Sequence, residues 1–224
     1  MVLALDFTDP FSTRLARARS VLDEVKGSVA AVKVNHHLLL PFGLEGLRDV
    51  IAACKQEELP LIADLKMNDV ESTNLSIVNA LFSYGFDAVI ANPFVGYREG
   101  LGRAIAEVHS LRGGVLLLVY MSHAGAREGY SLRLSDGTPI YRVFAKRARD
   151  WGADGVIVSA KSPRKVMEVR NLVGAACLIF SPGVGAQGGS AKGPIPAGAD
   201  FLIVGRSITG ATNPRNIVRK LNGG

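Results

Sequence analysis

The stretch Gly85-Phe86-Asp87-Ala88-Val89-Ile90 has two close copies further along the chain, Gly152-Ala153-Asp154-Gly155-Val156-Ile157 and Gly198-Ala199-Asp200-Phe201-Leu202-Ile203. Each copy joins a glycine, an aspartate two residues later and a short apolar run. The glycine can end a helix in the left-handed conformation, and the apolar run can then begin a buried strand. This quasi-repeat predicts a chain in which helices and strands alternate.

Apolar runs alternate with amphipathic stretches along the rest of the chain as well. We predict eight strands, at Val2–Leu5, Val29–Val34, Leu61–Leu65, Ala88–Ala91, Val115–Tyr120, Gly155–Val158, Leu178–Ser181 and Phe201–Val204. Amphipathic stretches with apolar residues three and four apart are predicted as helices, among them Leu15–Val25, Leu47–Glu57, Leu75–Tyr84, Ile140–Trp151 and Val166–Leu172. Continuous apolar strands separated by helices indicate a parallel sheet covered by helices.

Two folds use this alternation, the closed (β/α)8 barrel and the open, doubly wound sheet. A ligand site in an open sheet draws on a few neighbouring strands, whereas the catalytic face of a barrel collects residues from strands all around it. Polar residues follow the first, second, third, fifth, seventh and eighth predicted strands. We therefore predict an α/β fold, a (β/α)8 TIM barrel that forms a single domain over residues 1–224, with its active site at the carboxyl ends of the strands.

Composition narrows the classes of function. No apolar stretch approaches the roughly 18 residues that cross a bilayer, and no signal peptide is recognisable, so we expect no membrane association and a cytoplasmic location. The net charge of +6 is dispersed along the chain, which favours a small anionic ligand over nucleic acid. Neither Cys54 and Cys177 nor the four histidines show metal-ligand spacing, and we expect no metal site built from them.

Three charged residues follow one buried run, in Leu61-Ile62-Ala63-Asp64-Leu65-Lys66-Met67-Asn68-Asp69. Because side chains alternate along a strand, Asp64 and Lys66 share a face. Asp69 falls in the turn or at the start of the next helix, where it can complete an Asp, Lys, Asp array. Charges at the carboxyl end of a barrel strand usually take part in chemistry.

Two further charges lie at the neighbouring strands. Asp6 follows the first strand, and Lys33 lies between Val32 and Val34 in the second. A buried lysine needs a partner, so we expect Lys33 to pair with the carboxylates of the third strand. Taken singly, Asp6 and Asp69 could be turn or cap residues and Lys33 a strand-end lysine. Their occurrence at adjacent strands favours a shared site.

Loops after the later strands suggest an anion site. Ser122 follows the fifth strand, although a loop serine often bonds only to backbone. The glycine-rich run 182–190 follows the seventh strand, and Gly205-Arg206-Ser207 follows the eighth. Glycines let backbone amides approach an oxyanion, and the loops after strands seven and eight form the usual phosphate site of this barrel. Arg206 would add a charged clamp where a helix begins, so we predict phosphate binding there.

Taken together, these residues resemble the orotidine 5'-monophosphate decarboxylase family. The resemblance runs from Asp6 to about Ser207, through Lys33, the Asp64-x-Lys66-x-x-Asp69 motif with Thr73, Met121-Ser122-His123, the run from Pro182 to Gly189 and Gly205-Arg206-Ser207. The Asp-x-Lys-x-x-Asp motif alone is shared with magnesium-dependent relatives, the 3-keto-gulonate-phosphate decarboxylases and hexulose-phosphate synthases. Those relatives typically carry an acidic residue in place of Lys33 and lack the serine and glutamine that read uracil.

The resemblance implies decarboxylation of orotidine 5'-monophosphate to uridine 5'-monophosphate in pyrimidine biosynthesis, without metal or other cofactor. Lys66 would stabilise the carbanion at C6 and supply its proton. Asp64 would either hold Lys66 charged and oriented or strain the substrate carboxylate. Lys33 would join Asp64 and a ribose hydroxyl, and Asp6 would accept a hydrogen bond from the ribose.

The resemblance also implies a homodimer. Asp69 and Thr73, four residues apart, are expected on one face of the helix after the third strand. In the family this face reaches the neighbouring subunit's active site, so both residues are expected to act across the interface. The sequence thus predicts two subunits that each complete the other's site.

The remaining substrate contacts follow from the same resemblance. Ser122 and Gln187 would read the pyrimidine edge, and Pro182 is placed among the substrate-binding residues. Gln187 with Gly205 and Arg206 would hold the phosphate. Alternatives remain: a magnesium-dependent sugar-phosphate decarboxylase or synthase, a non-catalytic barrel that binds a phosphate ligand, and an imine-forming role for the motif's lysine.

Overall fold

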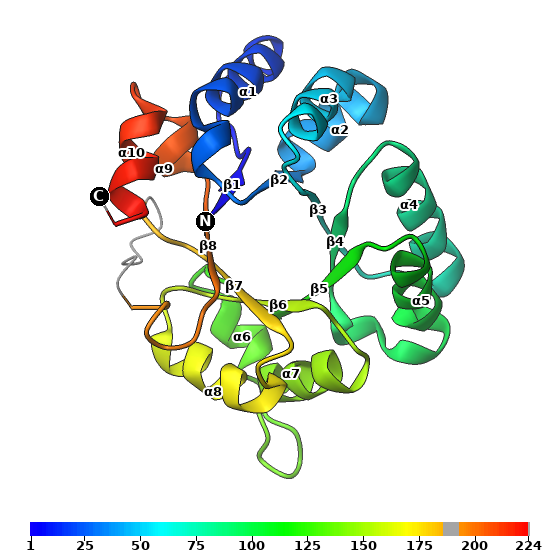
Figure 1. Ribbon diagram of the computed structural model, residues 1–224. Helices are drawn as coiled ribbons and strands as arrows, with labels where there is room; N and C mark the ends of the chain where they lie inside the picture. The colour runs from blue at the N-terminus through cyan, green and yellow to red at the C-terminus, as the bar shows by residue number, and fades with distance from the viewer. Residues whose placement is uncertain (186–192, 224) are drawn as a thin grey trace.

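The computed structural model describes residues 1–185 and 193–223, and within these ranges eight parallel strands close into a barrel surrounded by helices (Figure 1). Each strand pairs with the next one along the chain, and the first also pairs with the last. The strands are β1 Val2–Ala4, β2 Ala31–Asn35, β3 Leu61–Met67, β4 Ala88–Ala91, β5 Gly114–Tyr120, β6 Gly155–Val158, β7 Leu178–Pro182 and β8 Phe201–Val204. The predicted (β/α)8 barrel is confirmed, and the strand ends differ from the predicted ends by one or two residues at most.

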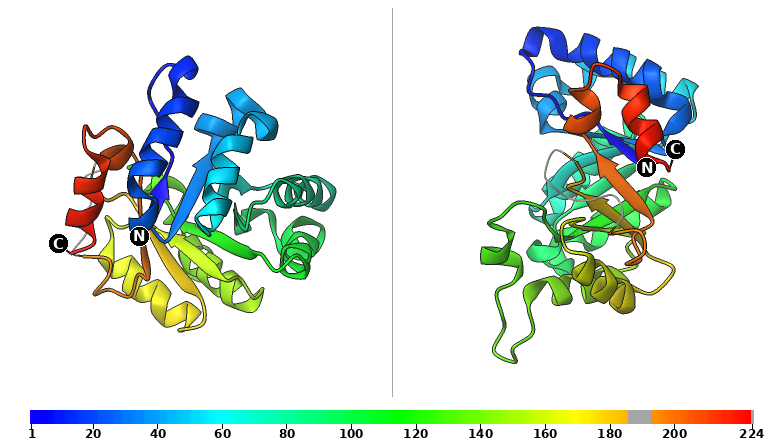
Figure 2. Two further views of the ribbon diagram at one scale, coloured as in Figure 1. Left: turned by 45° about the horizontal axis from the view of Figure 1, so that its top comes forward. Right: turned by 90° about the vertical axis from the view of Figure 1, so that its left-hand side faces the viewer.

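Helices cover the outside of the barrel on all sides (Figures 1 and 2). They are α1 Phe11–Val25, α2 His36–Gly46, α3 Arg48–Gln56, α4 Glu71–Ser83, α5 Gly102–Ser110, α6 Ala126–Tyr130, α7 Ile140–Asp150, α8 Pro163–Val173, α9 Arg206–Thr209 and α10 Pro214–Leu221, with short helical turns η1 Lys26–Ser28, η2 Pro93–Val95 and η3 Tyr97–Leu101. Three helices begin earlier than predicted, α1 at Phe11, α4 at Glu71 and α8 at Pro163. Their first turns are largely polar or exposed and so carry no apolar periodicity. No described helix is long and apolar enough to cross a membrane.

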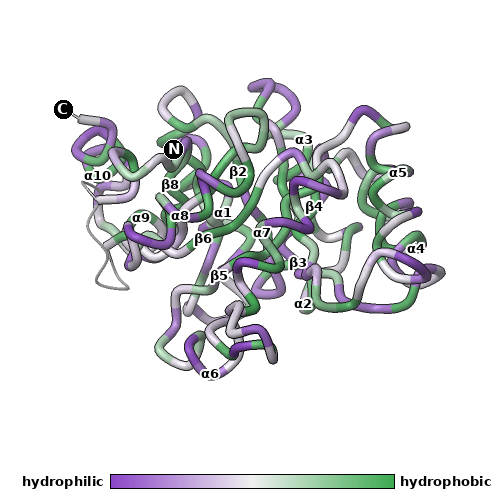
Figure 3. Tube along the Cα trace, turned by 90° about the horizontal axis from the view of Figure 1, so that it is seen from below, coloured by the Kyte–Doolittle hydropathy of each residue, from purple (hydrophilic) through white to green (hydrophobic). Residues whose placement is uncertain are grey.

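Alternation along the strands separates two apolar cores. One set of side chains fills the inside of the barrel: Val2, Ala4, Ala31, Ile62, Ile90, Leu116, Leu118, Ile157, Phe180 and Ile203. The larger core lies between the strands and the helices. The central strands are accordingly mostly hydrophobic, whereas outer helices alternate hydrophobic and hydrophilic positions (Figure 3). Because side chains fill the interior of the barrel, a ligand can bind at its mouth but not inside it.

The aspartates of the quasi-repeat hold neighbouring strands together at the end of the barrel opposite the mouth. Asp87, Asp154 and Asp200 each stand one residue before a strand, and each carboxylate accepts a hydrogen bond from a backbone N–H of the preceding strand. The donors are Leu61 at 2.7 Å, Val115 at 2.8 Å and Ile179 at 2.7 Å. Each carboxylate also meets a basic side chain of an outer helix, Lys55, His109 or Arg170. The repeated aspartate therefore stabilises the sheet at the amino-terminal ends of the strands.

Asp154→Ala tests this role. The substitution leaves the Val115 N–H without its acceptor, and we expect the free energy of unfolding to fall by about 1–3 kcal/mol in urea denaturation. Asp150→Ala is the matched control, because among the described residues the Asp150 side chain pairs only with Arg149, in an exposed ion pair; we expect it to change stability by less than about 0.5 kcal/mol. Equal losses in the two variants would contradict the assignment.

Candidate active site

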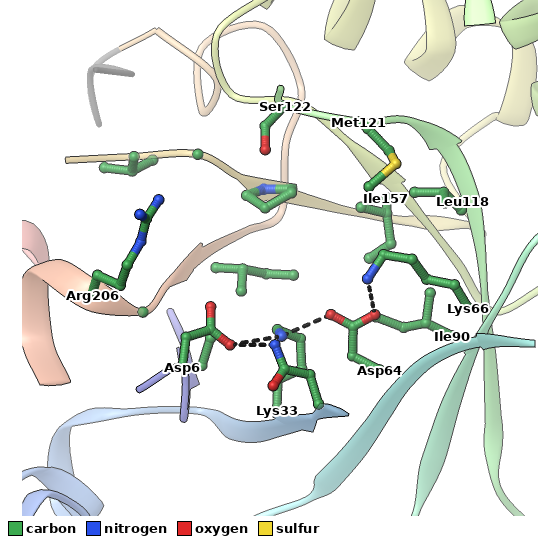
Figure 4. Close-up of a pocket in the computed structure, with 17 residues that line it drawn as sticks. Asp6, Lys33, Asp64, Lys66, Ile90, Leu118, Met121, Ser122, Ile157 and Arg206 are labelled. Atoms are coloured by element: carbon green, nitrogen blue, oxygen red, sulfur yellow. Dashed lines mark hydrogen bonds and ion pairs between the residues drawn. The ribbon is translucent and has the colours of Figure 1, made fainter. Parts of the chain in front are cut away.

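A cavity opens at the carboxyl ends of the strands, and all eight strands contribute to its lining (Figure 4). Its polar members are Asp6, Lys33, Asn35, Asp64, Lys66, Ser122 and Arg206. The apolar members and glycines are Ala4, Ile90, Leu118, Met121, Ile157, Pro182, Gly183, Val184, Ile203 and Gly205. The cavity therefore combines a charged wall with an apolar floor, as sites for small polar ligands do.

Four charged side chains form a continuous chain along this wall. Asp64 accepts hydrogen bonds from both lysines, through Oδ2 from Lys33 Nζ at 2.7 Å and through Oδ1 from Lys66 Nζ at 2.7 Å. Lys33 Nζ also lies 3.4 Å from Asp6 Oδ1. The charges alternate in sign from Lys66 through Asp64 and Lys33 to Asp6. The expected pairing of Lys33 with the carboxylate of the third strand is confirmed.

Burial strengthens the electrostatic interactions between these four charged side chains. The side chains of Lys33 and Asp64 are 6% and 9% exposed, whereas that of Lys66 is 33% exposed. Burial alone would raise the pKa of Asp64, but the ammonium groups of Lys33 and Lys66 outweigh it and hold that pKa below its ordinary value. Burial alone would lower the pKa of Lys33, but Asp64 and Asp6 outweigh it and raise that pKa. Both groups are therefore charged at neutral pH.

Lys66 lies on a β-bulge. Ala63 and Met67 of β3 pair with Val89 and Ala91 of β4, so three residues of β3 stand opposite one residue of β4. Lys66 has a φ angle of 50°, in the left-handed region that few residues other than glycine adopt. Such a conformation costs on the order of 1 kcal/mol and persists where the surrounding structure holds it. Bulges commonly redirect a side chain beside an active site, and this one lies where the lysine meets Asp64.

On the opposite side of the cavity, the described residues provide one cation, which comes from another strand end. Arg206 is the first residue of α9 and lies across the pocket from Lys66 (Figure 4). Gly205 precedes it, and a Cβ atom at Gly205 would lie 2.6 Å from Asp6 Oδ2. Only glycine lets the end of β8 pass this close to Asp6. The guanidinium suits a phosphate or carboxylate, so the cavity can hold an anionic group far from Lys66.

Most of the predicted site residues come together in this cavity. Eight of them line it: Asp6, Lys33, Asp64, Lys66, Ser122, Pro182, Gly205 and Arg206. Gln187 lies outside the described residues. Asp69 and Thr73 are exposed and are absent from the described lining of their own chain's cavity.

The expectation that Asp69 and Thr73 share a helix is wrong. The helix α4 begins at Glu71 after the cap residue Val70, so only Thr73 is helical. Asp69 lies in the preceding turn, where its carboxylate accepts a hydrogen bond from the Val70 N–H at 2.7 Å. This local hydrogen bond is the physical reason that Asp69 lies outside the helix, because an aspartate side chain that bonds to nearby backbone favours a turn over a helix interior.

Sequence reasoning missed Asn35. This residue ends β2 and lines the cavity, and its side chain donates to Asp6 Oδ1 at 2.7 Å. A polar residue at a strand end, just before a helical stretch, is a common helix-cap signal that could have drawn attention to it. The signal does not reveal the contact with Asp6, because that contact joins two different strands.

The carboxylates of the cavity are already paired with an ammonium group. Asp6 and Asp64 both bond to Lys33, which lies between them. Among the described residues there is no group of three or more His, Cys, Asp or Glu side chains suited to hold a metal ion. The donors present thus form a lysine-centred charge network.

Comparison with known proteins shows one family along nearly the whole chain. Residues 1–221 match the model of the orotidine 5'-phosphate decarboxylase / HUMPS family. Orotidine 5'-phosphate decarboxylases of Methanosarcina acetivorans and Pyrococcus abyssi are each 38% identical over 99% of this chain, which covers 92% and 96% of their lengths. The crystal structure of the Pyrococcus horikoshii enzyme has a TM-score of 0.80 at 34% identity, covering 98% of this chain and 96% of that one. The Methanocaldococcus jannaschii enzyme complexed with the inhibitor BMP has a TM-score of 0.83 at 28% identity, with 98% and 95% covered.

Asp64→Asn tests the charge network through stability. At neutral pH we expect the variant to lose about 3 kcal/mol of unfolding free energy, because two ammonium groups keep no carboxylate between them. Since its pKa is lowered on folding, Asp64 contributes stability above its ordinary pKa of about 3.9 and loses that contribution as pH falls through the lowered value. In urea denaturation, the difference between wild type and variant should hold above about pH 5 and shrink below about pH 4. A difference unchanged by acid would contradict the network, and Asp150→Asn serves as the exposed control.

Proposed function

The chain belongs to the orotidine 5'-phosphate decarboxylase / HUMPS family, and we propose that it decarboxylates orotidine 5'-monophosphate through a C6 carbanion that Lys66 stabilises and protonates. The product is uridine 5'-monophosphate, so the chain is a carbon-carbon lyase of pyrimidine biosynthesis. The observation that carries the proposal is the position of Lys66. Its ammonium group is held 2.7 Å from Asp64, across the cavity from Arg206.

The reaction requires a cation in the plane of the pyrimidine ring. When the bond between C6 and the carboxylate breaks, CO2 leaves and the electron pair stays on C6, where it cannot delocalise into the π system. An ammonium group in a partly buried site stabilises this charge as it develops. Lys66 then donates a proton to C6, which completes uridine 5'-monophosphate, and the neutral lysine takes a proton from solvent.

Asp64 is proposed to hold the two lysines in place. Each of its carboxylate oxygens accepts a hydrogen bond from one ammonium group, which supports an orienting role. Repulsion between Asp64 and the substrate carboxylate would act in the same direction, since it disappears as CO2 leaves. The hydrogen bonds favour orientation of the lysines as the main contribution of Asp64 to catalysis, because Asp64 is already bonded to both of them before substrate binds.

The rest of the cavity suits the rest of the nucleotide. Arg206 and the backbone at Gly205 would bind the phosphate, and Asp6 with Lys33 would bind the ribose between the phosphate and the ring. The pyrimidine would then lie on the apolar floor. Ser122 and Pro182 would contact it there, with Gln187, outside the described residues, completing both the ring and the phosphate contacts. Binding energy from the remote phosphate can hold the reacting carbon against Lys66.

We propose that the reaction needs no metal ion. Lys33 supplies a positive charge between Asp6 and Asp64, where a magnesium-dependent enzyme would need carboxylates free to bind the ion. Activity measured in excess chelator distinguishes a metal-free reaction from a magnesium-dependent one. Loss of activity with chelator, restored by magnesium, would favour the sugar-phosphate decarboxylase or synthase alternative.

We also propose that the chain works as a homodimer in the cytoplasm. Asp69 and Thr73 are exposed beside the mouth rather than facing their own cavity, which suits residues that act in a partner's site. Large apolar side chains are also exposed in the segments that follow β1 to β5: Phe11, Leu40, Val70, Phe94 and Leu132 are each more than half exposed. A second copy that covers this rim would bury them and bring each Asp69 toward the other subunit's ribose site.

Lys66→Ala tests the reaction centre. With orotidine 5'-monophosphate and excess chelator, the wild type should show the ultraviolet change that accompanies uridine monophosphate formation. We expect the variant to lose about 10⁴-fold or more in kcat, since it lacks both the charge and the proton donor. Its binding of uridine 5'-monophosphate should stay measurable by calorimetry.

Lys146→Ala, on the exposed side of α7, is the control and should keep wild-type activity. Near-normal turnover by Lys66→Ala would refute the assignment of the proton donor. A covalent adduct with substrate after borohydride treatment would favour an imine mechanism instead.

Subunit mixing tests the dimer. Lys66→Ala and Asp69→Ala subunits should each be nearly inactive alone. In a mixed dimer, one site takes Lys66 from one subunit and Asp69 from the other, so that site is intact. An equal mixture that has exchanged subunits should recover about a quarter of the wild-type sites. If the mixture shows only the average of the two variants' activities, Asp69 does not act across an interface.

A further inference from the structure

We propose that Asn35 is the positioning residue for Asp6, holding that carboxylate in the orientation in which it binds the ribose. The inference rests on the proposed function, in which Asp6 accepts a hydrogen bond from the ribose. Asn35 lines the cavity at the end of β2, beside Lys33 on the same strand and opposite Asp64 on β3. It therefore lies within the charge network while remaining neutral itself.

The orientation of the Asn35 amide is determined by two different partners. Its Oδ1 atom accepts a hydrogen bond from the His37 N–H at 2.9 Å and so caps the start of α2. Its Nδ2 atom donates to Asp6 Oδ1 at 2.7 Å. Because only the oxygen can accept from a backbone N–H, the nitrogen is the atom that faces Asp6. The helix cap thus determines that the amide nitrogen of Asn35 donates the hydrogen bond to Asp6.

The backbone on both sides of the Asp6 side chain is held as well. The Asp6 carbonyl accepts a hydrogen bond from the Thr209 hydroxyl at 2.7 Å. The next N–H, that of Phe7, donates to His37 Nδ1 at 3.2 Å. His37 is the same residue whose N–H binds Asn35, so the end of β1 and the start of α2 form one connected unit. What remains free at Asp6 is rotation of its carboxylate, and Asn35 restrains that rotation.

This restraint has a consequence for the charge network. Lys33 Nζ is 2.7 Å from Asp64 but 3.4 Å from Asp6, so the lysine binds Asp64 more closely. Without the Asn35 donor, Coulomb attraction would draw the Asp6 carboxylate toward Lys33. Both bonds to Asp6 use Oδ1, and Oδ2 faces Gly205 at the phosphate end of the cavity. Asn35 therefore keeps one oxygen of Asp6 directed to where the sugar joins its phosphate.

The test is a double-mutant cycle with Asp6→Ala and Asn35→Ser. Serine caps a helix as well as asparagine does but is too short to replace the amide donor to Asp6, so α2 should be kept while that contact is lost. We expect Asn35→Ser to lower kcat/KM for orotidine 5'-monophosphate about tenfold, as for the loss of one hydrogen bond to a charged group. The affinity for uridine 5'-monophosphate should fall by a similar factor. In the Asp6→Ala background, Asn35→Ser should have no further effect on either quantity.

Asn213→Ser is the matched control. Asn213 caps α10 through its side chain in the same way, at 3.0 Å from the Asn216 N–H, but it does not line the cavity. It should leave kcat/KM and product affinity unchanged. Asn35→Gly, which removes cap and donor together, should lower the melting temperature more than Asn35→Ser does.

The outcomes separate the inference from the function on which it rests. A wild type without turnover would refute the proposed function, and the cycle can then still be read from uridine 5'-monophosphate affinity. If Asp6→Ala changes neither turnover nor affinity, the ribose role of Asp6 is wrong, and the inference falls with it. If Asp6→Ala is impaired while Asn35→Ser is silent, or is fully additive to it, Asp6 keeps its role and the positioning role of Asn35 is refuted.

Discussion

The Asp64 carboxylate lies between two ammonium groups and gives one oxygen to each, Lys33 through Oδ2 and Lys66 through Oδ1. Lys33 and Asp64 remain charged at their depth of burial because each is paired, with the other and with Asp6 or Lys66, since an unpaired ion there costs several kcal/mol. The pairing also determines where the mouth of the barrel is positively charged. Both lysines line the cavity, and Lys66 is the more exposed of the two, so it presents more of its side chain to a ligand.

One end of the barrel carries residues that stabilise the sheet, and the other end carries the residues of the proposed active site. At the amino-terminal ends of the strands, Asp87, Asp154 and Asp200 bind backbone N–H groups of neighbouring strands and hold the sheet together. At the carboxyl ends, the charged residues bind mainly one another and line a cavity. This division lets the mouth contain a bulge, a lysine in the left-handed conformation and closely spaced charges, while the aspartates hold the strands together at the other end.

The cavity is also polarised along its length. Arg206 and Gly205 come from the end of β8, and Lys66 comes from the bulge in β3, on opposite sides of the mouth. In the proposed binding mode, a nucleotide held through its phosphate at the Arg206 side would present its ring to Lys66. Asp6 and Asn35 lie between, and their connection through His37 to the start of α2 makes the middle of the site rigid. Preorganised charge of this kind does not have to rearrange during the reaction.

The sequence by itself determined the barrel and most of the site. The Gly-x-Asp repeat, the apolar strands and the polar residues at six strand ends are local patterns, and each has a direct physical reading in backbone conformation or burial. Alternation predicted Asp64 and Lys66 on one face, and both line the cavity, although Lys66 reaches it from a bulge that interrupts the alternation. The Asp-x-Lys-x-x-Asp motif alone left the chemistry open, and the resemblance to one family that Lys33, Ser122, Gln187 and Arg206 completed implied the reaction.

Only the tertiary structure decided which distant groups touch. The bond from Asn35 to Asp6, the bulge that sets φ at Lys66, and the role of Asp154 at Val115 all depend on pairing between strands, and residue spacing along the chain does not encode that pairing. The turn at Asp69 depends on a bond to the Val70 N–H that competes with the helix. A sequence states which groups are present at each strand end, whereas the register of a closed barrel sets the distances between them, and hydrogen bonds and charge pairs form only at those short distances.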